Sequence, residues 1–415
     1  MPTPQIRLLA GSAELRRHTG AWNDLWLRSS AALPTKRAQG VDQWCQAFAQ
    51  PENLEAIIVQ EDDRLIAGLP LVVSRKHGLT THAELPSNCW SVAGDLMVDA
   101  ECDLTTTCDQ IVRFLATRPY RVLKLDLIEF QSERWSAFQS ALQSQGHAYR
   151  TSSSYSVGVV DILHDWEAYQ KSWSGNHRQA VRKSRRQLEA KGELHVERIQ
   201  VDTSELESRL QECFDVEDRG WKGQEGTSIL KSAGMDSFYQ TEAVTMARSG
   251  MLDLWTLRFD GRLIAFEYCH LAKGVCFSHK ISFDPEFQKY GPGRLLRCMQ
   301  LEQLHAEPGM RKLDTLGILC SSKAKWSTSA YQLGRLVASS RPGFSSALLR
   351  TAFAARPLIK RALNKSESTV ETPKLGATKV FDLAKPQATL TPIPSGSGFQ
   401  PVTLGSGDTM SQPLS

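Results

Sequence analysis

The sequence has no apolar run long enough to cross a membrane, and its first residues lack the run of about 7 to 15 apolar residues that a secretory signal contains. Its nine cysteines are scattered and never spaced C-x-x-C, which argues against a disulfide framework and a zinc site. The motifs H-E-x-x-H and G-x-S-x-G are absent too, which removes the metalloprotease and serine-hydrolase signatures. We therefore expect a cytoplasmic protein with reduced thiols and no metal.

What is present is the composition of an ordinary globular protein: 415 residues, 41% hydrophobic and 23% charged. This length allows two or three domains, each with its own core. The net charge of +4 is too small for this length to imply a nucleic-acid partner. Basic segments therefore have to be judged one by one.

Two short patterns recur in the same order in the two halves of the sequence. Arg64-Leu-Ile-Ala67 returns as Arg262-Leu-Ile-Ala265, each after a strand-like run and an acidic turn, which is the pattern of a hairpin. Lys124-Leu-Asp126 returns as Lys312-Leu-Asp314. Strand and helix patterns alternate around both copies, as in an α/β protein. We interpret the recurrence as an internal duplication.

A glycine-containing stretch, Gln288-Lys-Tyr-Gly-Pro-Gly-Arg294, follows a predicted strand, Val275 to Phe283, and opens a predicted helix, Pro292 to His305. The glycines let the backbone come close to a ligand, and Pro292 suits the first turn of a helix. A helix that starts after a strand directs unpaired N–H groups outward, which favours phosphate binding. Leu296 replaces the third glycine of a dinucleotide fingerprint. The alternative is that the glycines serve only the turn.

Between the two copies, a helical region from Asp165 to Gly192 carries a dense row of basic residues. This row is either a solvated helix face or a surface for an anionic substrate, RNA or acidic lipid headgroups. Its members are Arg178, Arg182, Lys183, Arg185, Arg186 and Lys191.

The C-terminal part has a different character. Residues 341–364 combine apolar and basic side chains in an amphipathic pattern interrupted at Pro357. Such a helix can lie on anionic lipid or pack on the preceding domain. Residues 365–415 are rich in Ser, Thr, Pro and Gly with little to bury, so we expect this tail to be disordered.

Taken together, these features resemble the CelD-type (cellulose-biosynthesis-associated) branch of the GNAT superfamily, which is related to the Fem-type peptidoglycan transferases. The resemblance is strongest over about 160–340. The residues that carry it are Asn176-His-Arg178, Trp221-Lys-Gly223, Asp260-Gly-Arg-Leu-Ile-Ala265, Phe283-Asp-Pro-Glu-Phe287 ahead of Tyr290-Gly-Pro-Gly293, and Lys325-Trp326 after Asp314.

The resemblance implies a mixed, strongly bent α/β sheet in tandem GNAT-like domains, with the acyl donor where two neighbouring strands splay apart. The first domain, 1–155, would be degenerate, because it has no counterpart of the glycine stretch, and the second, 160–340, would be catalytic. A basic amphipathic helix, 341–364, and the tail, 365–415, would follow.

The glycine stretch matches Q/R-x-x-G-x-G/A, the coenzyme A pyrophosphate loop of GNAT enzymes. The resemblance therefore implies acyl-coenzyme A, such as acetyl-coenzyme A, as co-substrate. The residues expected to bind it are Gln288, Lys289, Gly291, Gly293 and Arg294. Fem relatives use aminoacyl-tRNA instead, so that donor stays an alternative, and a catalytically inactive scaffold for a polysaccharide-synthesis complex is a third.

The implied reaction moves the acyl group to an amine, a small molecule or a glycan or lipid precursor, in polysaccharide, cell-envelope or lipid-precursor metabolism. The protein would act in the cytoplasm, with the helix 341–364 as a candidate contact to the inner face of the membrane. Transfer RNA is a partner only if it is the donor.

Attack on a thioester needs a neutral amine, yet a free alkylamine with a pKa of about 10 is protonated at pH 7, so a base is required. Glu267 interrupts an apolar run, Leu263 to Leu271, where an unpaired charge is costly, and we rank it first as base. The alternative is a buried ion pair with a residue such as Lys280. Further candidates are His270, His279 and Asp314, with Tyr290 and Lys325 as proton donors or substrate contacts. Asp314 recurs as Asp126 in the copy expected to be inactive, which favours a structural role for it.

Overall fold

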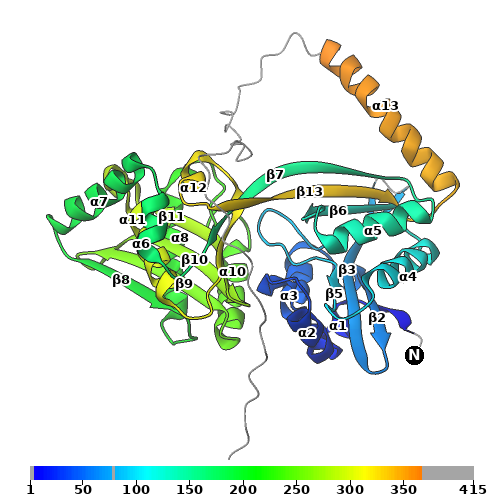
Figure 1. Ribbon diagram of the computed structural model, residues 1–415, viewed down its shortest axis with the longest axis horizontal. Coiled ribbons are helices and arrows are strands. Elements are labelled where there is room, and N and C mark those ends of the chain that lie inside the picture. Colours follow the sequence, from blue (N-terminus) through cyan, green and yellow to red (C-terminus); the bar gives the residue numbers. More distant parts are fainter. Residues whose placement is uncertain (1–3, 77–79, 367–415) are drawn as a thin grey trace, which may run out of the picture. The chain divides into compact units, whose positions relative to one another are not determined.

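The computed structural model describes residues 4–76 and 80–366 (Figure 1). Within these residues the strands form one mixed sheet of 13 strands, in the order β1-β2-β3-β4-β6-β13-β7-β12-β11-β10-β9-β8, with β5 beside β3. The strands are β1 (Gln5–Ala10), β2 (Leu54–Glu61), β3 (Arg64–Lys76), β4 (Thr80–Glu84), β5 (Met97–Val98), β6 (Val122–Ile128), β7 (Tyr149–Asp161), β8 (Leu194–Ile199), β9 (Leu252–Phe259), β10 (Arg262–Ala272), β11 (Val275–Phe283), β12 (Lys312–Ile318) and β13 (Ser329–Ser339).

The two halves of the sheet repeat one topology. Counted from its outer edge, each half has four antiparallel strands and a fifth that is parallel to the fourth: β1-β2-β3-β4-β6 in one and β8-β9-β10-β11-β12 in the other. Both copies of Arg-Leu-Ile-Ala begin the third strand, and both copies of Lys-Leu-Asp lie on the fifth. The tandem α/β fold predicted from the recurring patterns is therefore confirmed.

The halves are joined by two long strands, β7 and β13, which run side by side between them (Figure 1). The C-terminal part of β7 pairs with β12, and the C-terminal part of β13 pairs with β6. The strand β7 follows the first half in the sequence but pairs with the second, and β13 follows the second half but pairs with the first. The predicted boundary, between 155 and 160, lies within β7, so the two halves share one continuous sheet.

Helices cover both faces of each half, as the apolar clusters show. In the first half, α4 (Leu104–Thr117) and α5 (Glu133–Ser144) pack on one face, and α1 (Ser12–Arg17), α2 (Thr19–Arg28) and α3 (Ala38–Phe48) on the other. In the second half, one face carries α6 (Trp166–Ser172), α7 (Gly175–Glu189) and α11 (Pro292–Ala306), and the other α8 (Leu206–Arg219) and α10 (Met235–Arg248). Short helices connect these elements: η1 (Pro34–Lys36), η2 (Pro51–Asn53), α9 (Trp221–Gln224), η3 (Pro285–Tyr290) and α12 (Ser321–Ala324).

Strand β10 shows why its sequence is apolar almost throughout. Beyond a bulge at Ile264 its side chains alternate between the two faces, so that Ala265 packs on the side of α11 and the next residue, Phe266, on the side of α8 and α10. A strand buried on both faces carries a nearly continuous apolar run instead of an alternating one.

The long helical region expected over Asp165 to Gly192 is two helices, α6 and α7. Ser174 interrupts it, because its side chain accepts a hydrogen bond from His177 N–H and so caps the start of α7. Arg178 donates to carbonyls at the end of α6, among them that of Lys171 at 2.9 Å. One of the predicted basic residues is thus used to join the two helices.

The C-terminal helix α13 (Phe344–Ser366) runs through Pro357, so the predicted interruption there is wrong. Phe344 and Leu348 are 83% and 57% exposed and, four residues apart, lie on one side of the helix. The predicted disordered tail lies outside the described residues, apart from the last two residues of α13. No helix in the described part of the chain has the length and hydropathy needed to span a membrane.

Candidate functional site

The second half of the sheet opens between its fourth and fifth strands. The parallel strands β11 and β12 are paired at only three positions, Val275 with Lys312, Cys276 with Leu313 and Phe277 with Asp314. Beyond Asp314, the pairing of β12 with β7 becomes irregular, and Leu316 has a φ of 49°, a conformation that is strained for a leucine. The two strands therefore separate after Phe277 and Asp314.

The strand β11 carries a β-bulge beside this opening. Across β10, Ser278 pairs with Cys269 and Lys280 with Tyr268, so that His279 is an extra residue without a partner. In a regular strand, His279 and Lys280 would point to opposite faces. The bulge changes that alternation, and both side chains line the cavity described next.

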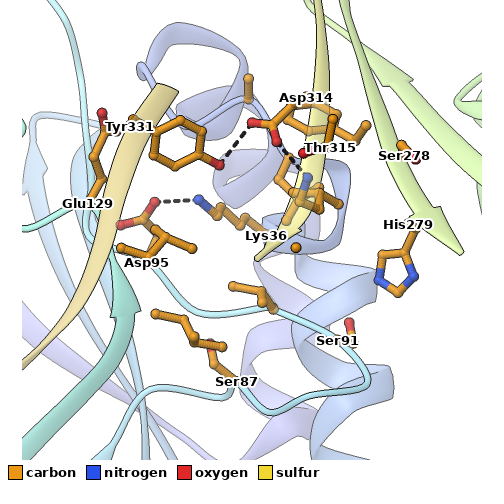
Figure 2. Close-up of a pocket in the computed structure, with 18 of the residues that line it drawn as sticks. Lys36, Ser87, Ser91, Asp95, Glu129, Ser278, His279, Asp314, Thr315 and Tyr331 are labelled. Atoms are coloured by element: carbon orange, nitrogen blue, oxygen red, sulfur yellow. Dashed lines mark hydrogen bonds and ion pairs between the residues drawn. The ribbon is translucent and has the colours of Figure 1, made fainter. Parts of the chain in front are cut away.

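A cavity of about 910 Å³ lies at the opening and is lined by both halves of the protein (Figure 2). The second half contributes residues of β11, β12 and α12, and the first contributes β6 and the segments 30–36 and 87–95, while β7 and β13 add side chains between them. Its volume is within the range of small-molecule sites, which is roughly 300–1,000 Å³.

Asp314 is the carboxylate placed at the point where the strands separate. It is 8% exposed and accepts hydrogen bonds from Leu316 N–H at 2.8 Å and from the Tyr331 hydroxyl at 2.9 Å (Figure 2). Burial raises the pKa of Asp314 above its usual value, because the charged form is poorly solvated there.

Three basic side chains of the cavity wall have lowered pKa values because of burial. The pKa of His279 falls to about 3, so the imidazole is neutral, and its Nδ1 is buried without a hydrogen-bond partner among the described residues. Burial, with Lys222 nearby, lowers the pKa of Lys280 to about 8. Burial and the charge of Arg297 do the same to Lys323, whose Nζ donates to Thr315 O at 2.9 Å.

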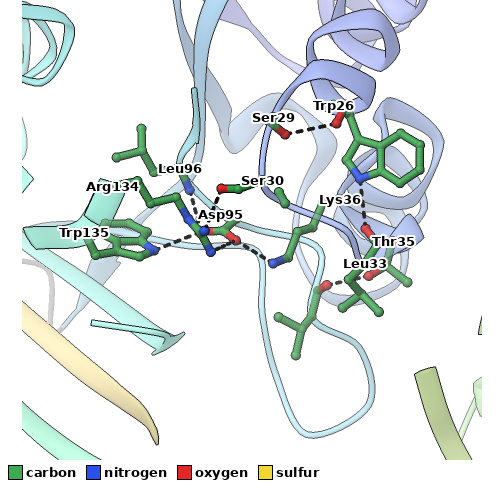
Figure 3. A network of polar contacts seen from close by, with 12 residues as sticks. Trp26, Ser29, Ser30, Leu33, Thr35, Lys36, Asp95, Leu96, Arg134 and Trp135 are labelled. Atoms are coloured by element: carbon green, nitrogen blue, oxygen red, sulfur yellow. Dashed lines mark hydrogen bonds and ion pairs between the residues drawn. The ribbon is translucent and has the colours of Figure 1, made fainter. Parts of the chain in front are cut away.

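The first-half wall is held by a buried polar network around Asp95 (Figure 3). Its carboxylate forms ion pairs with Lys36 and Arg134 and accepts from Trp135 Nε1 and Leu96 N–H, both at 2.9 Å. Burial alone would raise the pKa of Asp95, but the charges of Arg134 and Lys36 bring it down to about 2. The network fixes the two segments that face the opening of the second half.

Glu267, ranked first as base from the sequence, does not line the cavity. It is fully buried and forms an ion pair with Arg297 of α11, whose Nη2 lies 2.6 Å from Glu267 Oε1. Arg297 also donates to Ser278 Oγ at 2.9 Å. The anticipated ion pair is present, but its partner is Arg297 instead of Lys280. The role of Glu267 as base stays a prediction, and because this pairing holds its carboxylate away from the cavity, Asp314 is the carboxylate that we consider as base below.

The other predicted catalytic residues divide into two groups. His279 and Asp314 line the cavity. His270 is fully buried beside Glu242, with 3.3 Å between Nε2 and Oε2, and lies outside the cavity lining, as do Tyr290 and the exposed Lys325. Sequence reasoning missed Tyr331 and Lys323. No local pattern marks them, because β13 and α12 reach the cavity only in the folded chain.

The predicted donor loop joins β11 to α11 through η3. Gly291 has a φ of 65° and precedes Pro292, the first residue of the helix. A Cβ on Gly291 would lie 2.2 Å from Arg294 Nη2, so the Arg294 side chain lies against this glycine. A Cβ on Gly293 would meet only Phe283, at 3.5 Å, while Gln288 and Lys289 are exposed. The loop therefore leaves an accessible backbone between three polar side chains.

The basic helix α7 packs against α11 and η3, beside this loop. Arg182, Lys183 and Arg186 are exposed. On the inner face of α7, His177 packs against Trp326 with 4.4 Å between ring centroids, and burial lowers its pKa to about 4. The helix thus presents three exposed cations to solvent and a neutral histidine to the core.

Within residues 4–76 and 80–366, no group of three or more His, Cys, Asp or Glu side chains is arranged to hold a metal ion.

Comparisons with known proteins agree with the sheet topology. Residues 175–326 match a family model described as an acetyltransferase (GNAT) domain. The chain is similar to the crystal structure of FemX, with 11% identity over 78% of this chain and 95% of that chain and a TM-score of 0.55. A search of curated proteins finds no match.

Two further solved structures are similar at lower scores. One is the C-terminal domain (DUF2156) of a putative lysylphosphatidylglycerol synthetase from Agrobacterium fabrum, at 15% identity over 82% of this chain and 97% of that chain, TM-score 0.48. The other is a tandem GNAT protein from the clavulanic acid biosynthesis pathway, at 16% identity over 82% of this chain and all (100%) of that chain, TM-score 0.45. The match over residues 175–326 and the similarity to FemX show a GNAT fold, and the CelD-type branch stays a prediction.

Proposed function

We propose that this chain is an N-acyltransferase that moves an acyl group from acyl-coenzyme A to an amine. The observation that carries this proposal is the separation of β11 and β12 after three paired positions, at a cavity of about 910 Å³ lined by Asp314 and His279. The match of residues 175–326 to a GNAT acetyltransferase domain supports the same class. Acetyl is the acyl group that this match favours.

The donor pyrophosphate would lie against the loop from Gln288 to Arg294. First-turn N–H groups of α11, such as that of Gly293, and the positive end of the helix dipole favour a dianion there. Lys289 and Arg294 add mobile positive charge, and so do the exposed cations of α7. The acyl arm would enter between β11 and β12 beyond Phe277 and Asp314, where the two strands are no longer paired.

Asp314 would bind the ammonium group of the acceptor and take its proton. A carboxylate with a raised pKa is a better base for an amine than an ordinary one, and the Tyr331 hydroxyl keeps it oriented. When the amine attacks the thioester carbonyl, negative charge develops on the oxygen, and a backbone N–H of β11 beyond Phe277 would stabilise it. The C–S bond then breaks, and the thiol of coenzyme A leaves with a proton.

The donor site is tested by placing an aspartate at Gly293. The position tolerates a Cβ, and an acidic residue in the first turn stabilises a helix, so Gly293→Asp should fold normally. Its carboxylate would repel the pyrophosphate, and the affinity for acetyl-coenzyme A, measured by calorimetry, should fall at least ~10-fold. Gly293→Ala is the control for side-chain size. Equal affinity in the aspartate variant and the wild type would place the donor elsewhere.

Aminoacyl-tRNA is a second candidate donor, favoured by the exposed row Arg182, Lys183 and Arg186. Its binding should weaken steeply with salt and should be lost when all three are changed to Ala. Acetyl-coenzyme A binding would change far less in that variant. A protein that binds neither donor would be the inactive scaffold.

The acceptor is, on the resemblance noted above, an amine of polysaccharide, cell-envelope or lipid-precursor metabolism, and a metabolite profile of a deletion strain tests this. Contact of α13 with anionic lipid is a separate proposal, supported by the exposed Phe344 and Leu348. Leu348→Asp should reduce co-sedimentation with anionic vesicles, while equal co-sedimentation would argue for a helix without a lipid role.

A further inference from the structure

The charged side chains that line the cavity divide into paired and unpaired ones. Asp95 is neutralised by Lys36 and Arg134, and Asp126 by Arg335. Each of these two carboxylates already has a counter-charge, so neither creates a demand for a cationic ligand.

Six charged side chains of the lining form no ion pair in the described part of the chain: Glu129, Lys280, Arg311, Lys312, Asp314 and Lys323. Arg311 and Lys312 are exposed, so water solvates their charges, whereas Glu129, Lys280, Asp314 and Lys323 are buried or half-buried. Figure 2 shows Glu129 and Asp314 on either side of Tyr331. A half-buried charge without a counter-charge is costly, and a ligand of opposite charge removes that cost.

Lys280 is held in place without being neutralised. Its Nζ lies 4.6 Å from the ring centroid of Trp90 and 4.9 Å from that of Tyr239. The Tyr239 hydroxyl donates to Trp90 O at 2.7 Å, which joins the two rings. Trp90 belongs to a loop of the first half and Tyr239 to α10, so both halves of the protein position this ammonium group. Aromatic faces attract a cation but leave its charge available to an anion.

The bulge in β11 explains how the ammonium reaches the cavity. In a strand without this bulge, the neighbouring residues His279 and Lys280 would lie on opposite faces. With it, a neutral imidazole and a cation line the same wall, across the opening from the carboxylates of β12 and of the segment after β6.

We infer that the acceptor is an amine that also carries an anionic group, a carboxylate or a phosphate. Asp314 and Glu129 meet the ammonium end, and Lys280, with Lys323, meets the anionic end. This inference rests on the proposed function, because it assigns the acceptor of the same site. An amine without an anionic group would leave the ammonium groups of Lys280 and Lys323 without an ion-pair partner.

The test uses two matched pairs of probes, glucosamine 6-phosphate with glucosamine and alanine with alaninamide. Calorimetry on the full chain in the presence of coenzyme A gives each affinity, and thiol release from acetyl-coenzyme A gives each rate. In at least one pair, the probe that carries an anionic group besides its ammonium group should bind at least ~10-fold more tightly than the probe without one, as a charge-assisted contact predicts. Which pair responds tells a phosphate from a carboxylate.

Lys280→Met removes the charge and keeps the aliphatic stem between the rings. It should cancel the preference for the probe with an anionic group and change the affinity of the probe without one less than about twofold. Lys280→Arg, which keeps the charge, should retain most of the preference and controls for folding.

The inference is overturned if neutral and anionic probes bind equally, if none of the four binds, or if Lys280→Met weakens both members of a pair alike. Its failure is distinguishable from that of the proposed function. Turnover of acetyl-coenzyme A only with amines that lack an anionic group would reject the inferred subsite and support the proposed acyltransferase. Selective binding of an amine with an anionic group, by a protein that neither binds nor cleaves acetyl-coenzyme A, would support the subsite and reject the acyltransferase.

Discussion

Asp126 and Asp314 occupy equivalent places in the two halves of the sheet, on β6 and β12, yet their environments are opposite. Burial alone would raise the pKa of Asp126, but Arg335 and Lys124 lower it. Burial raises the pKa of Asp314, which accepts instead from the neutral hydroxyl of Tyr331. Both Arg335 and Tyr331 come from β13. The duplication therefore preserved the carboxylate, and the shared strand gave each copy a different neighbour.

The connection from the fourth strand to the next helix differs between the halves as well. After β11 it forms η3 and the glycine turn that starts α11. After β4 it is a longer segment, of which residues 87–92 and 95 line the cavity that both halves share. Under the proposed function, the first connection would bind the donor and the second would form a wall for the acceptor, so that the two copies would contribute different parts of one site.

The buried ion pair of the second half should show the largest effect. Glu267→Gln leaves the Arg297 guanidinium buried without a counter-charge, and we expect a loss of about 3–5 kcal/mol of unfolding free energy in urea titrations. The double variant Glu267→Met with Arg297→Met should recover much of this loss, because no unpaired charge remains. A stable Glu267→Gln protein without turnover would restore Glu267 as the base.

The substitution Asp314→Asn tests most directly whether the two equivalent carboxylates have different roles. If Asp314 is the base, as proposed, its loss should reduce kcat ~10²-fold or more, with little change in the calorimetric affinity for acetyl-coenzyme A. The matched change in the first half, Asp126→Asn, should leave kcat within about threefold. Equal losses in the two variants would mean that both carboxylates serve the structure alone.

The acid sensitivity of the second half sharpens the comparison. His177 is buried neutral with a pKa of about 4, below the usual 6.5, so the unfolded chain takes up this proton first as the pH falls. The stability that this histidine contributes is present above pH 6.5 and is lost toward pH 4, by about 2 kcal/mol. His177→Phe keeps the ring packed against Trp326 and should flatten that part of the stability–pH curve. An unchanged curve would contradict a buried neutral His177.

The smallest effect is expected at the exposed ion pair of the first half. Because the side chain of Arg335 is 45% exposed, Asp126→Asn should cost less than about 1 kcal/mol of unfolding free energy, and the cost should shrink at high salt. A loss as large as that in Glu267→Gln would mean that solvent does not screen this pair.

The sequence by itself determined the local elements. The apolar patterns place β11 at Val275–Phe283, as predicted, and α11 one residue longer than predicted, because Pro292 and the glycines fix where the helix begins. The recurring Arg-Leu-Ile-Ala and Lys-Leu-Asp patterns gave the tandem order of the strands, since strand periodicity and turn residues act over a few residues.

Only the tertiary structure decided what shares the site. Glu267 was a reasonable candidate because it interrupts an apolar strand. Its ion-pair partner, Arg297, lies 30 residues later in the sequence on α11, and no local pattern encodes that pairing. Tyr331 reaches the cavity on β13, the strand that pairs with both β6 and β7. Lys323 reaches it on α12, and Trp90 on a loop of the first half. Desolvation depends on everything that surrounds a group, so the opposite pKa shifts of Asp126 and Asp314 follow from the packed structure and not from the identical residues beside them.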